Sequence, residues 1–367
     1  MNTPTVSIIM PIYNASQYLK ESLGGLTNQT LKNIEIICVN DGSTDNSLNI
    51  IKEYAYNDSR IKIIDKLNSG YGNSMNEGLK IASGEYIGIL EPDDFADNAM
   101  FENLYRVAKE TDADVVKSNY YEYSQASQSN NYFEVLNGQE YNKVTSAFEN
   151  ERVVFMRPCI WSAIYKKELL FNNNIWFNET PGASYQDTAF AFKVWTCAEK
   201  VVFVRDAYLH YRIDNENSSV KSSGKIFSIC DEFQSMQSFL NQDKNKKEKF
   251  IKILQVLKLD SYIWNLQRIA PEYQEIFRDQ IALEFIKADY EKILDKTYFD
   301  NWRWQQVQSF IQLYYQKKQS KNWDISSEEM QFLKRRIYDL ENSNSYKIGH
   351  LLMFIPGKIK RLIKHEH

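Results

Sequence analysis

Three carboxylates end an apolar run in the stretch GEYIGILEPDDFAD, residues 84–97. Residues 86–90 are apolar, and Glu91, Asp93 and Asp94 follow them directly. Hard divalent cations such as Mg²⁺ and Mn²⁺ prefer carboxylate oxygens together with the phosphates of a substrate. The acids therefore predict a cation site. The alternative interpretation is that they solvate a turn and cap the next helix, because short acidic motifs are common.

Strand and helix patterns alternate along the first third of the chain. Apolar runs rich in β-branched residues predict strands at residues 5–13, 34–40, 61–66, 85–90 and 113–123. Helical spacing predicts helices at residues 14–29, 46–57, 72–84 and 97–109. This alternation predicts an α/β fold with a mostly parallel sheet flanked by helices. Ligands of such sheets bind at the carboxyl ends of the strands, where the acids fall.

The rest of the chain changes character twice. Residues 123–150 are polar and predict an irregular surface excursion, 159–170 and 186–200 predict helices, and 201–212 predict a late strand. From residue 226 to about 315 the pattern is helical and rich in charge. We expect a first domain over 1–225, a helical domain over 226–330 and a separate tail over 331–367.

Net charge, cysteine spacing and the length of the apolar runs exclude several classes of protein. The 367 residues carry a net charge of -4, which leaves no basic footprint for nucleic acid. The four cysteines lack the spacing of a metal knuckle and are expected to be reduced thiols of a cytoplasmic protein. No apolar run approaches the roughly 20 residues that span a bilayer, and no signal-peptide pattern opens the chain.

The tail is basic. Residues 331–367 hold eight Lys and Arg against three Asp and Glu, and SYKIGHLLMFIPGKIKRLIK mixes lysines with large apolar residues. Such a composition predicts an amphipathic helix on an anionic membrane surface. The alternative is that its apolar face packs on the helical domain or on another subunit of a homo-oligomer.

Four separated motifs carry a family resemblance. VSIIMPIYN, VNDGSTDNS, NSGYGNSMNEGLKIASGEYIGILEPDD and YQDTAF occur in this order. Over roughly residues 5–220 the chain resembles the family 2 glycosyltransferases, which have a GT-A fold. The resemblance implies inverting transfer of a sugar from a nucleotide-diphospho-sugar, a UDP-hexose or UDP-N-acetylhexosamine, to a hydroxyl of a glycan. It implies a Mn²⁺ or Mg²⁺ cofactor and an acceptor, plausibly lipid-linked, in cell-surface polysaccharide synthesis at the inner face of the membrane.

The resemblance also implies a nucleotide site over residues 1–122 and an acceptor part over 150–225. Asp41 would accept from the uracil N–H, although Asp and Gly are also the favoured residues of a plain turn. The family often has two acids there, and Asn40 replaces the first. The implied nucleotide-binding residues are Pro11, Tyr13, Asn14, Asp41, Asn68, Gly70 and Glu91. Glu91 stands where the family has Asp, and it would contact ribose or a metal-bound water.

Metal, base and acceptor residues follow from the same resemblance. Asp93 and Asp94 would hold the metal with His210, which could equally be a packed histidine at a strand end. Asp187 would be the general base. The alternative interpretation is that Asp187 is only an acid in the first turn of a helix, where the helix dipole favours it. The usual Glu before this base is replaced by Gln186. The resemblance implies contacts with the acceptor or the diphosphate for Trp161, Arg212 and Ser218. The alternative interpretations are core packing for Trp161 and a surface ion pair for Arg212.

Three other functions compete with that of a glycosyltransferase. A nucleotidyltransferase would need a basic phosphate-gripping loop near the N-terminus, and MPIYNASQYL has no Lys or Arg cluster. A Rossmann dehydrogenase would need G-x-G-x-x-G after the first strand. A catalytically degenerate binding or scaffolding subunit stays open because of Glu91 and Gln186.

Overall fold

The computed structural model describes residues 3–138, 141–215 and 226–320. Residues 1–310 form one compact unit and residues 311–367 a second. The domain boundaries expected at residues 225 and 330 remain predictions. Ser218 and the basic tail of residues 331–367 lie outside the described residues.

Ten strands of the described chain form one mixed sheet, in the order β3-β2-β1-β4-β9-β6-β10-β5, with β7 on β6 and β8 on β10. The strands are β1 (Val6–Ile12), β2 (Ile34–Asp41), β3 (Ile61–Lys66), β4 (Tyr86–Ile89), β5 (Phe95–Ala96), β6 (Val115–Ser124), β7 (Ser129–Phe133), β8 (Val144–Thr145), β9 (Ala163–Lys166) and β10 (Val201–Arg212). β1, β2, β3 and β4 pair in parallel, as do β6 and β10. Every residue of β1 and β2 is buried, as expected for strands covered on both faces.

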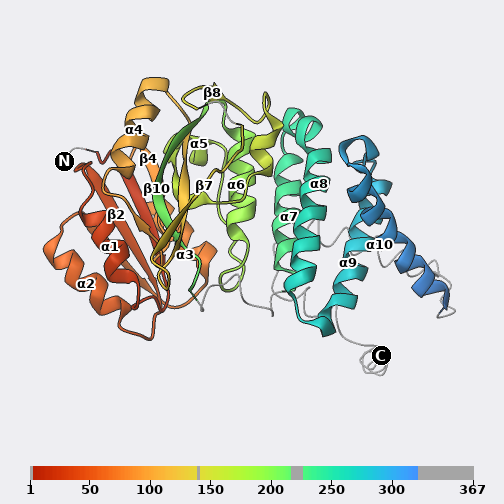
Figure 1. Cartoon of the computed structure of the whole chain (residues 1–367), viewed down its shortest axis with the longest axis horizontal. Coiled ribbons are helices and arrows are strands. Elements are labelled where there is room, and N and C mark those ends of the chain that lie inside the picture. Colours follow the sequence, from red (N-terminus) through yellow and green to blue (C-terminus); the bar gives the residue numbers. More distant parts are fainter. Residues whose placement is uncertain (1–2, 139–140, 216–225, 321–367) are drawn as a thin grey trace, which may run out of the picture. The chain divides into compact units, whose positions relative to one another are not determined.

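Helices flank this sheet and continue beyond it. They are α1 (Leu19–Thr27), α2 (Ser47–Asn57), α3 (Tyr71–Ile81), α4 (Met100–Thr111), α5 (Lys167–Asn172), α6 (Gln186–Cys197), α7 (Ser228–Leu240), α8 (Lys244–Arg268), α9 (Pro271–Tyr290) and α10 (Asn301–Ser320), with 3₁₀ turns at Glu151–Phe155, Ile160–Ser162 and Lys296–Tyr298. Figure 1 shows α6 between the sheet and α7. The predicted α/β class, followed by a helical region, is confirmed.

Two local predictions are wrong. Residues 163–166, predicted as part of a helix, form β9, which pairs antiparallel with both β4 and β6. Residues 123–150 are not simply irregular, because β6 runs to Ser124, turns back into β7 and is followed by β8. Pairing with distant strands decides both segments, and the local apolar pattern does not encode it.

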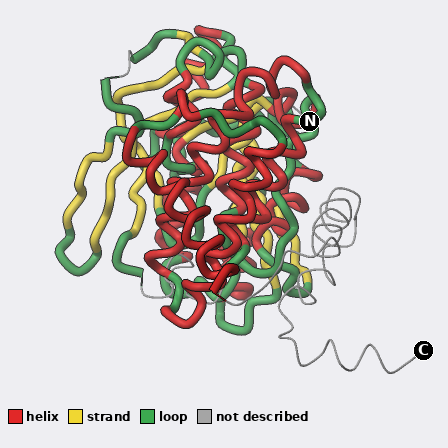
Figure 2. The backbone as a smooth tube through the Cα atoms, turned by 90° about the vertical axis from the view of Figure 1, so that its right-hand side faces the viewer, coloured by secondary structure: helices red, strands yellow, loops and turns green. Residues whose placement is uncertain are grey.

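The helical region beyond residue 226 has an apolar core of its own. Tyr262 of α8 packs edge-on against Phe233 of α7 with ring centroids 5.5 Å apart, and Phe277 of α9 lies 5.6 Å away. Figure 2 colours the helices red and the strands yellow. Among the described helices, we find none long and apolar enough to cross a bilayer.

Candidate active site

The loop after β4 presents its three carboxylates at the carboxyl end of the sheet. Arg212, the last residue of β10, donates from Nε to the carbonyl oxygen of Asp93 at 2.8 Å. Its backbone N–H donates to Oδ1 of Asp94 at 2.9 Å. The hydroxyl of Ser22, in α1, donates to the carbonyl oxygens of Pro92 and Asp94. Residues far away in the sequence therefore fix this loop.

Glu91 and Asp94 lie in surroundings that disfavour their charged forms. Burial raises the pKa of Glu91 to about 8, although the residue remains partly exposed. A hydrogen bond from the Tyr71 hydroxyl, 2.6 Å from Oε1, lowers this pKa, and the charges of Asp93 and Asp187 raise it. Burial and the charge of Asp93 also raise the pKa of Asp94 well above its usual value.

Asp94 keeps one carboxylate oxygen without a protein partner. Its Oδ2 is buried and accepts no hydrogen bond from any residue that the structure describes. Such an oxygen costs free energy unless a cation or a proton satisfies it. Asp93 is its neighbour, with Oδ2 accepting from Nδ2 of Asn215 at 2.7 Å. The pair fits a hard divalent cation that draws its remaining ligands from phosphates and water.

His210 does not join this pair. Its Nδ1 lies 2.7 Å from Oδ1 of Asn130, and its Nε2 lies 3.2 Å from Oδ1 of Asp97. The imidazole also stacks on Phe95, with ring centroids 4.3 Å apart. Over the described part of the chain, no three His, Cys, Asp or Glu side chains are grouped so that they could hold a metal ion. The structure therefore does not bring together the three predicted ligands.

Asp41 links the end of β2 to the loop after β3. Its Oδ1 accepts from the backbone N–H of Ser69 at 2.8 Å and from Nζ of Lys66. Its Oδ2 accepts from the backbone N–H of Gly70 at 2.9 Å. With three donors on two oxygens, the carboxylate retains acceptor capacity on Oδ2. A contact of Asp41 with uracil remains a prediction, and the structure adds that Asp41 shapes the loop.

The other predicted nucleotide residues gather at the same rim. Asn14 has φ 49° and accepts on Oδ1 from the backbone N–H of Thr44 at 2.8 Å, which ties the end of β1 to the loop after β2. A Cβ on Gly42 would lie 2.8 Å from the backbone nitrogen of Asn68, so these two loops touch. Pro11 pairs with Val39 inside the sheet. The neighbouring Tyr13 is 53% exposed.

Gly70 joins this rim to the segment before α6. Its φ of 93° suits glycine, and a Cβ there would lie 2.9 Å from the backbone nitrogen of Gly182. The backbone N–H of Tyr71, which begins α3, donates to the carbonyl oxygen of Gly182 at 3.1 Å. The loop over 178–185 is thereby held against the nucleotide side of the sheet.

Asp187 lies in the first turn of α6, at the end of that loop. Burial raises its pKa to about 6, although hydrogen bonds from the backbone and side chain of Thr188 lower it. The charge of Asp187 raises the pKa of both Glu91 and Tyr71. The charge of Asp187 therefore acts on Glu91 although the two residues are far apart in the sequence.

Gln186 and Arg212 have structural partners. Gln186 is buried, and its Nε2 donates to Oγ1 of Thr180 at 2.8 Å and to the carbonyl oxygen of Gly182 at 3.1 Å. The Arg212 side chain is 1% exposed and pairs with Glu21. Both residues shape the loops that carry the acids. A diphosphate contact of Arg212 remains a prediction.

Trp161 is buried beside the carboxylate loop. It stacks on Tyr211 with ring centroids 5.1 Å apart and meets Tyr120 edge-on at 4.7 Å. Burial and then the charges of Asp94 and Asp93 raise the pKa of Tyr211, which places the stack near these acids. An acceptor contact of Trp161 remains a prediction.

Sequence reasoning missed Tyr71, Asn215 and Ser22. Tyr71 lies within a motif that was recognised, but tyrosine is frequent in this chain and gave no signal of its own. Asn215 and Ser22 both contact the loop after β4. No local pattern distinguishes such residues from ordinary loop and helix positions.

Comparison with known proteins bears on the family and the fold. The family model described as glycosyl transferase family 2 matches residues 7–170. Glycosyltransferase GlyG of Streptococcus pneumoniae is 36% identical over 219 residues, which are 56% of this chain and 70% of GlyG. The putative glycosyltransferase EpsH of Bacillus subtilis is 30% identical, over 72% of this chain and 75% of EpsH. The uncharacterized glycosyltransferase EpsJ of the same organism is 33% identical, and the chain spans 62% of it.

Solved structures share the fold. S. aureus TarS 1–349 in complex with UDP-GlcNAc has a TM-score of 0.54 and 21% identity, and the match covers 84% of this chain and 92% of that one. TarS 1–349 in complex with UDP has a TM-score of 0.52. The sheet and its helices are accordingly of the GT-A type. The identity with GlyG and EpsH, over most of each relative, shows that this chain is a glycosyltransferase and belongs to glycosyl transferase family 2.

Proposed function

We propose that this glycosyltransferase moves a sugar from a UDP-sugar to a hydroxyl of a glycan, with inversion at the anomeric carbon. The observation that carries the proposal is Asp187, a carboxylate with a pKa of about 6 in electrostatic contact with Glu91. A base whose pKa is near the working pH is suited to removing the proton of an attacking hydroxyl. UDP-GlcNAc in the TarS complex supports a UDP-linked hexose or N-acetylhexosamine as donor.

In the proposed reaction, Asp187 accepts the proton of the acceptor hydroxyl while that oxygen attacks the anomeric carbon. A new carbon–oxygen bond forms, the bond from the anomeric carbon to the diphosphate oxygen breaks, and UDP leaves with the electron pair. Attack from the face opposite the diphosphate inverts the anomeric configuration. Asp41 and the loop that it fixes through Ser69 and Gly70 hold the nucleotide during this step.

Asp93 and Asp94 are the residues that would hold Mn²⁺ or Mg²⁺. When bound, such an ion neutralises the charge of the departing diphosphate. The buried Oδ2 of Asp94 supports this role because it has no protein donor among the described residues. Glu91, hydrogen-bonded to Tyr71, is left for the ribose or for the water around the ion.

A donor screen tests the proposal. The full chain is incubated with UDP-glucose, UDP-galactose, UDP-GlcNAc and UDP-GalNAc plus Mn²⁺, and released UDP is measured with and without EDTA. Release that EDTA abolishes supports a metal-dependent transferase, whereas full release in EDTA removes the metal from the mechanism. A UDP-sugar that raises the Tm without any release supports the degenerate binding subunit instead, since a ligand of the folded state stabilises it.

We also propose a membrane-bound acceptor and docking of the chain on the inner face of the membrane. Support comes from the basic composition of residues 331–367, because each basic side chain near anionic headgroups contributes about 1 kcal/mol. The test is co-sedimentation of vesicles with the full chain and with a chain ending at Glu341. Docking requires that only the full chain sediments, only with anionic lipid, and less at high salt. Equal behaviour of the two chains would favour packing on protein, for example in a homo-oligomer.

A further inference from the structure

Helix α8 places an exposed tryptophan beside the start of α6. Trp264 is 45% exposed although it is the largest type of apolar side chain. Its indole meets the ring of Tyr185 edge-on, with centroids 5.9 Å apart and an interplanar angle of 83°. Tyr185 immediately precedes α6 and lies two residues before Asp187. The aromatic pair therefore joins α8 to the residue that begins the turn carrying the proposed general base.

Buried polar contacts hold this aromatic pair rigidly. The Tyr185 hydroxyl donates to Oδ1 of Asn265 at 2.6 Å and accepts from Arg268. Asn265 is fully buried, and its Nδ2 donates to the carbonyl oxygen of Ile226 at 2.9 Å. The guanidinium of Arg268 lies 5.0 Å from the centroid of Trp264 and 5.2 Å from that of Tyr185. A surface fixed in this way loses little conformational entropy when a ligand binds it.

The backbone at this position is strained. Tyr185 has φ 59°, a left-handed conformation that is unusual for a bulky residue. Strain of this kind persists only where the surroundings impose it. Here the contacts of Asn265 and Arg268 impose it, and they aim the ring of Tyr185 at α8 rather than at the sheet.

From these contacts we infer that Trp264, Tyr185 and Arg268 form a subsite for a sugar ring of the acceptor glycan. The inference rests on the proposed function, because Tyr185 precedes the proposed general base, Asp187, by two residues. The apolar C–H face of a sugar packs on an exposed indole, and a guanidinium edge donates to its hydroxyls. Ligand sites commonly combine an aromatic wall with a few fixed polar groups in this manner.

The test uses a printed array of bacterial surface glycans, probed with the full chain in the presence of UDP and Mn²⁺. Four proteins are compared: the parent, Trp264→Ala, Tyr185→Phe and the matched control Trp302→Ala. Trp302 is 54% exposed and belongs to a different helix, α10. We expect the parent and Trp302→Ala to bind the same glycans. Trp264→Ala should bind them at least about tenfold more weakly, with a smaller loss for Tyr185→Phe, which keeps the ring.

UDP release without acceptor is measured on the same proteins, and it separates this inference from the proposed function. Unchanged release by Trp264→Ala together with lost glycan binding supports the subsite. Glycan binding equal to the parent in Trp264→Ala, an equal loss in Trp302→Ala, or a parent that binds no printed glycan overturns it. Absence of UDP release from every donor would instead defeat the proposed function, while Trp264-dependent binding would still support the sugar site.

Discussion

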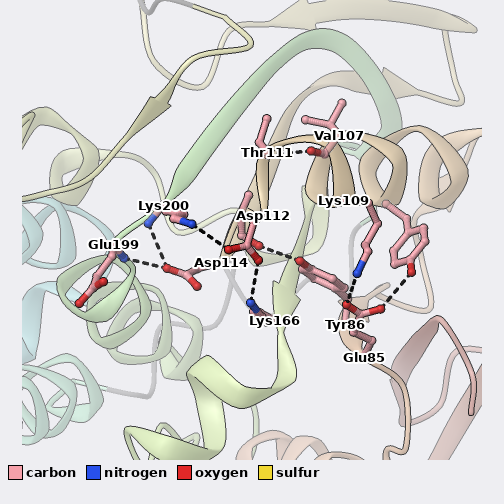
Figure 3. Close-up of polar contacts among 12 residues, drawn as sticks. Glu85, Tyr86, Val107, Lys109, Thr111, Asp112, Asp114, Lys166, Glu199 and Lys200 are labelled. Atoms are coloured by element: carbon pink, nitrogen blue, oxygen red, sulfur yellow. Dashed lines mark hydrogen bonds and ion pairs between the residues drawn. The ribbon is translucent and has the colours of Figure 1, made fainter.

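Carboxylates gather at both ends of the central sheet, and their surroundings differ. Where β4, β6 and β10 begin, Asp112 pairs with Lys200 at 2.8 Å and with Lys166 at 3.1 Å (Figure 3). Lys200 and then Lys166 lower the pKa of Asp112 to about 2. Nearby, Glu85 pairs with Lys109 at 2.9 Å, and its pKa is lowered although burial opposes this. At this end Asp112 and Glu85 each have a lysine side chain beside them.

Where the same strands end, the pKa values of several acids are raised instead of lowered. Burial raises the pKa of Glu91 to about 8 and that of Asp187 to about 6, and it raises that of Asp94 as well. The nearby guanidinium of Arg212 pairs with Glu21 and donates a hydrogen bond to the carbonyl oxygen of Asp93. The proposed metal ion would supply positive charge to the acids at this end.

Acids at the two ends differ in the expected effect of their surroundings on stability. An acid paired at the protein surface gains modest stability from its partner. A buried acid without a cation costs stability, and such groups persist chiefly at functional sites. The same residue type thus has opposite effects at the two ends, and substitutions can separate them.

The largest expected effect is at Asp187. Asp187→Asn should lower kcat at least about a hundredfold, the usual loss for a general base, while affinity for UDP stays unchanged. In the parent, activity should rise with pH through about 6, because the base acts only when it is deprotonated. Asp114→Asn, at the opposite end, should leave kcat unchanged; this acid accepts only from the backbone N–H groups of Glu199 and Lys200 among the contacts in Figure 3. Normal turnover of Asp187→Asn would remove it as the base.

The next effect is on the nucleotide. Asp41→Ala should weaken UDP binding by roughly 1.5 to 3 kcal/mol, the value of a hydrogen bond to a charged group. It should also reduce the preference for UDP over CDP. Calorimetric titration with both nucleotides measures the two quantities. If both nucleotides lose affinity equally, Asp41 acts only through the loop that it holds at Ser69 and Gly70.

A smaller effect concerns stability without metal. Asp94→Asn should raise the Tm in EDTA by roughly 2 °C, because Asn has no charged form for burial and Asp93 to disfavour. Asp112→Asn should lower the Tm, because it removes the pairs with Lys166 and Lys200, and its φ of 50° suits Asn. Mn²⁺ should stabilise the parent and not Asp94→Asn. Shifts of the same sign in both variants would show that the two ends do not differ.

A further effect is a slope of the free energy of unfolding with pH. Because the pKa of Glu91 is raised from 4.5 to about 8, the folded state binds this proton more tightly than the unfolded chain does. Its contribution to stability is therefore present at low pH and lost as pH rises towards 8, by up to about 1 kcal/mol per pH unit. Asp112 behaves in the opposite sense, and its contribution is lost as pH falls towards 2.

Denaturant unfolding in EDTA from pH 5 to pH 8 measures this slope, and Glu91→Gln should flatten it. Gln keeps the shape of the side chain and cannot titrate, which makes it the matched control. An unchanged slope in Glu91→Gln would mean that the carboxyl is not buried enough to retain its proton.

Most elements of the fold were predictable because their signals are local. Continuous apolar runs identified β1 and β2, and helical spacing identified α6 and the region from residue 226. β9 was not predictable, since a strand of four residues resembles one helical turn and exists only through its pairing with β4 and β6. The hairpin of β6 and β7 was missed for a related reason, because its polar residues resemble those of a loop.

The sequence by itself determined which acids stand at strand ends and helix starts, because strand length and helix period are local properties. Tertiary structure alone decided which of them meet. In the folded chain the charge of Asp187 acts on Glu91, and Asp41 accepts a hydrogen bond from Gly70. His210 contacts Asn130 and Asp97 through its two ring nitrogens. The physical reason is that burial and mutual charge, which set the pKa of each acid, depend on the distances between segments far apart in the chain.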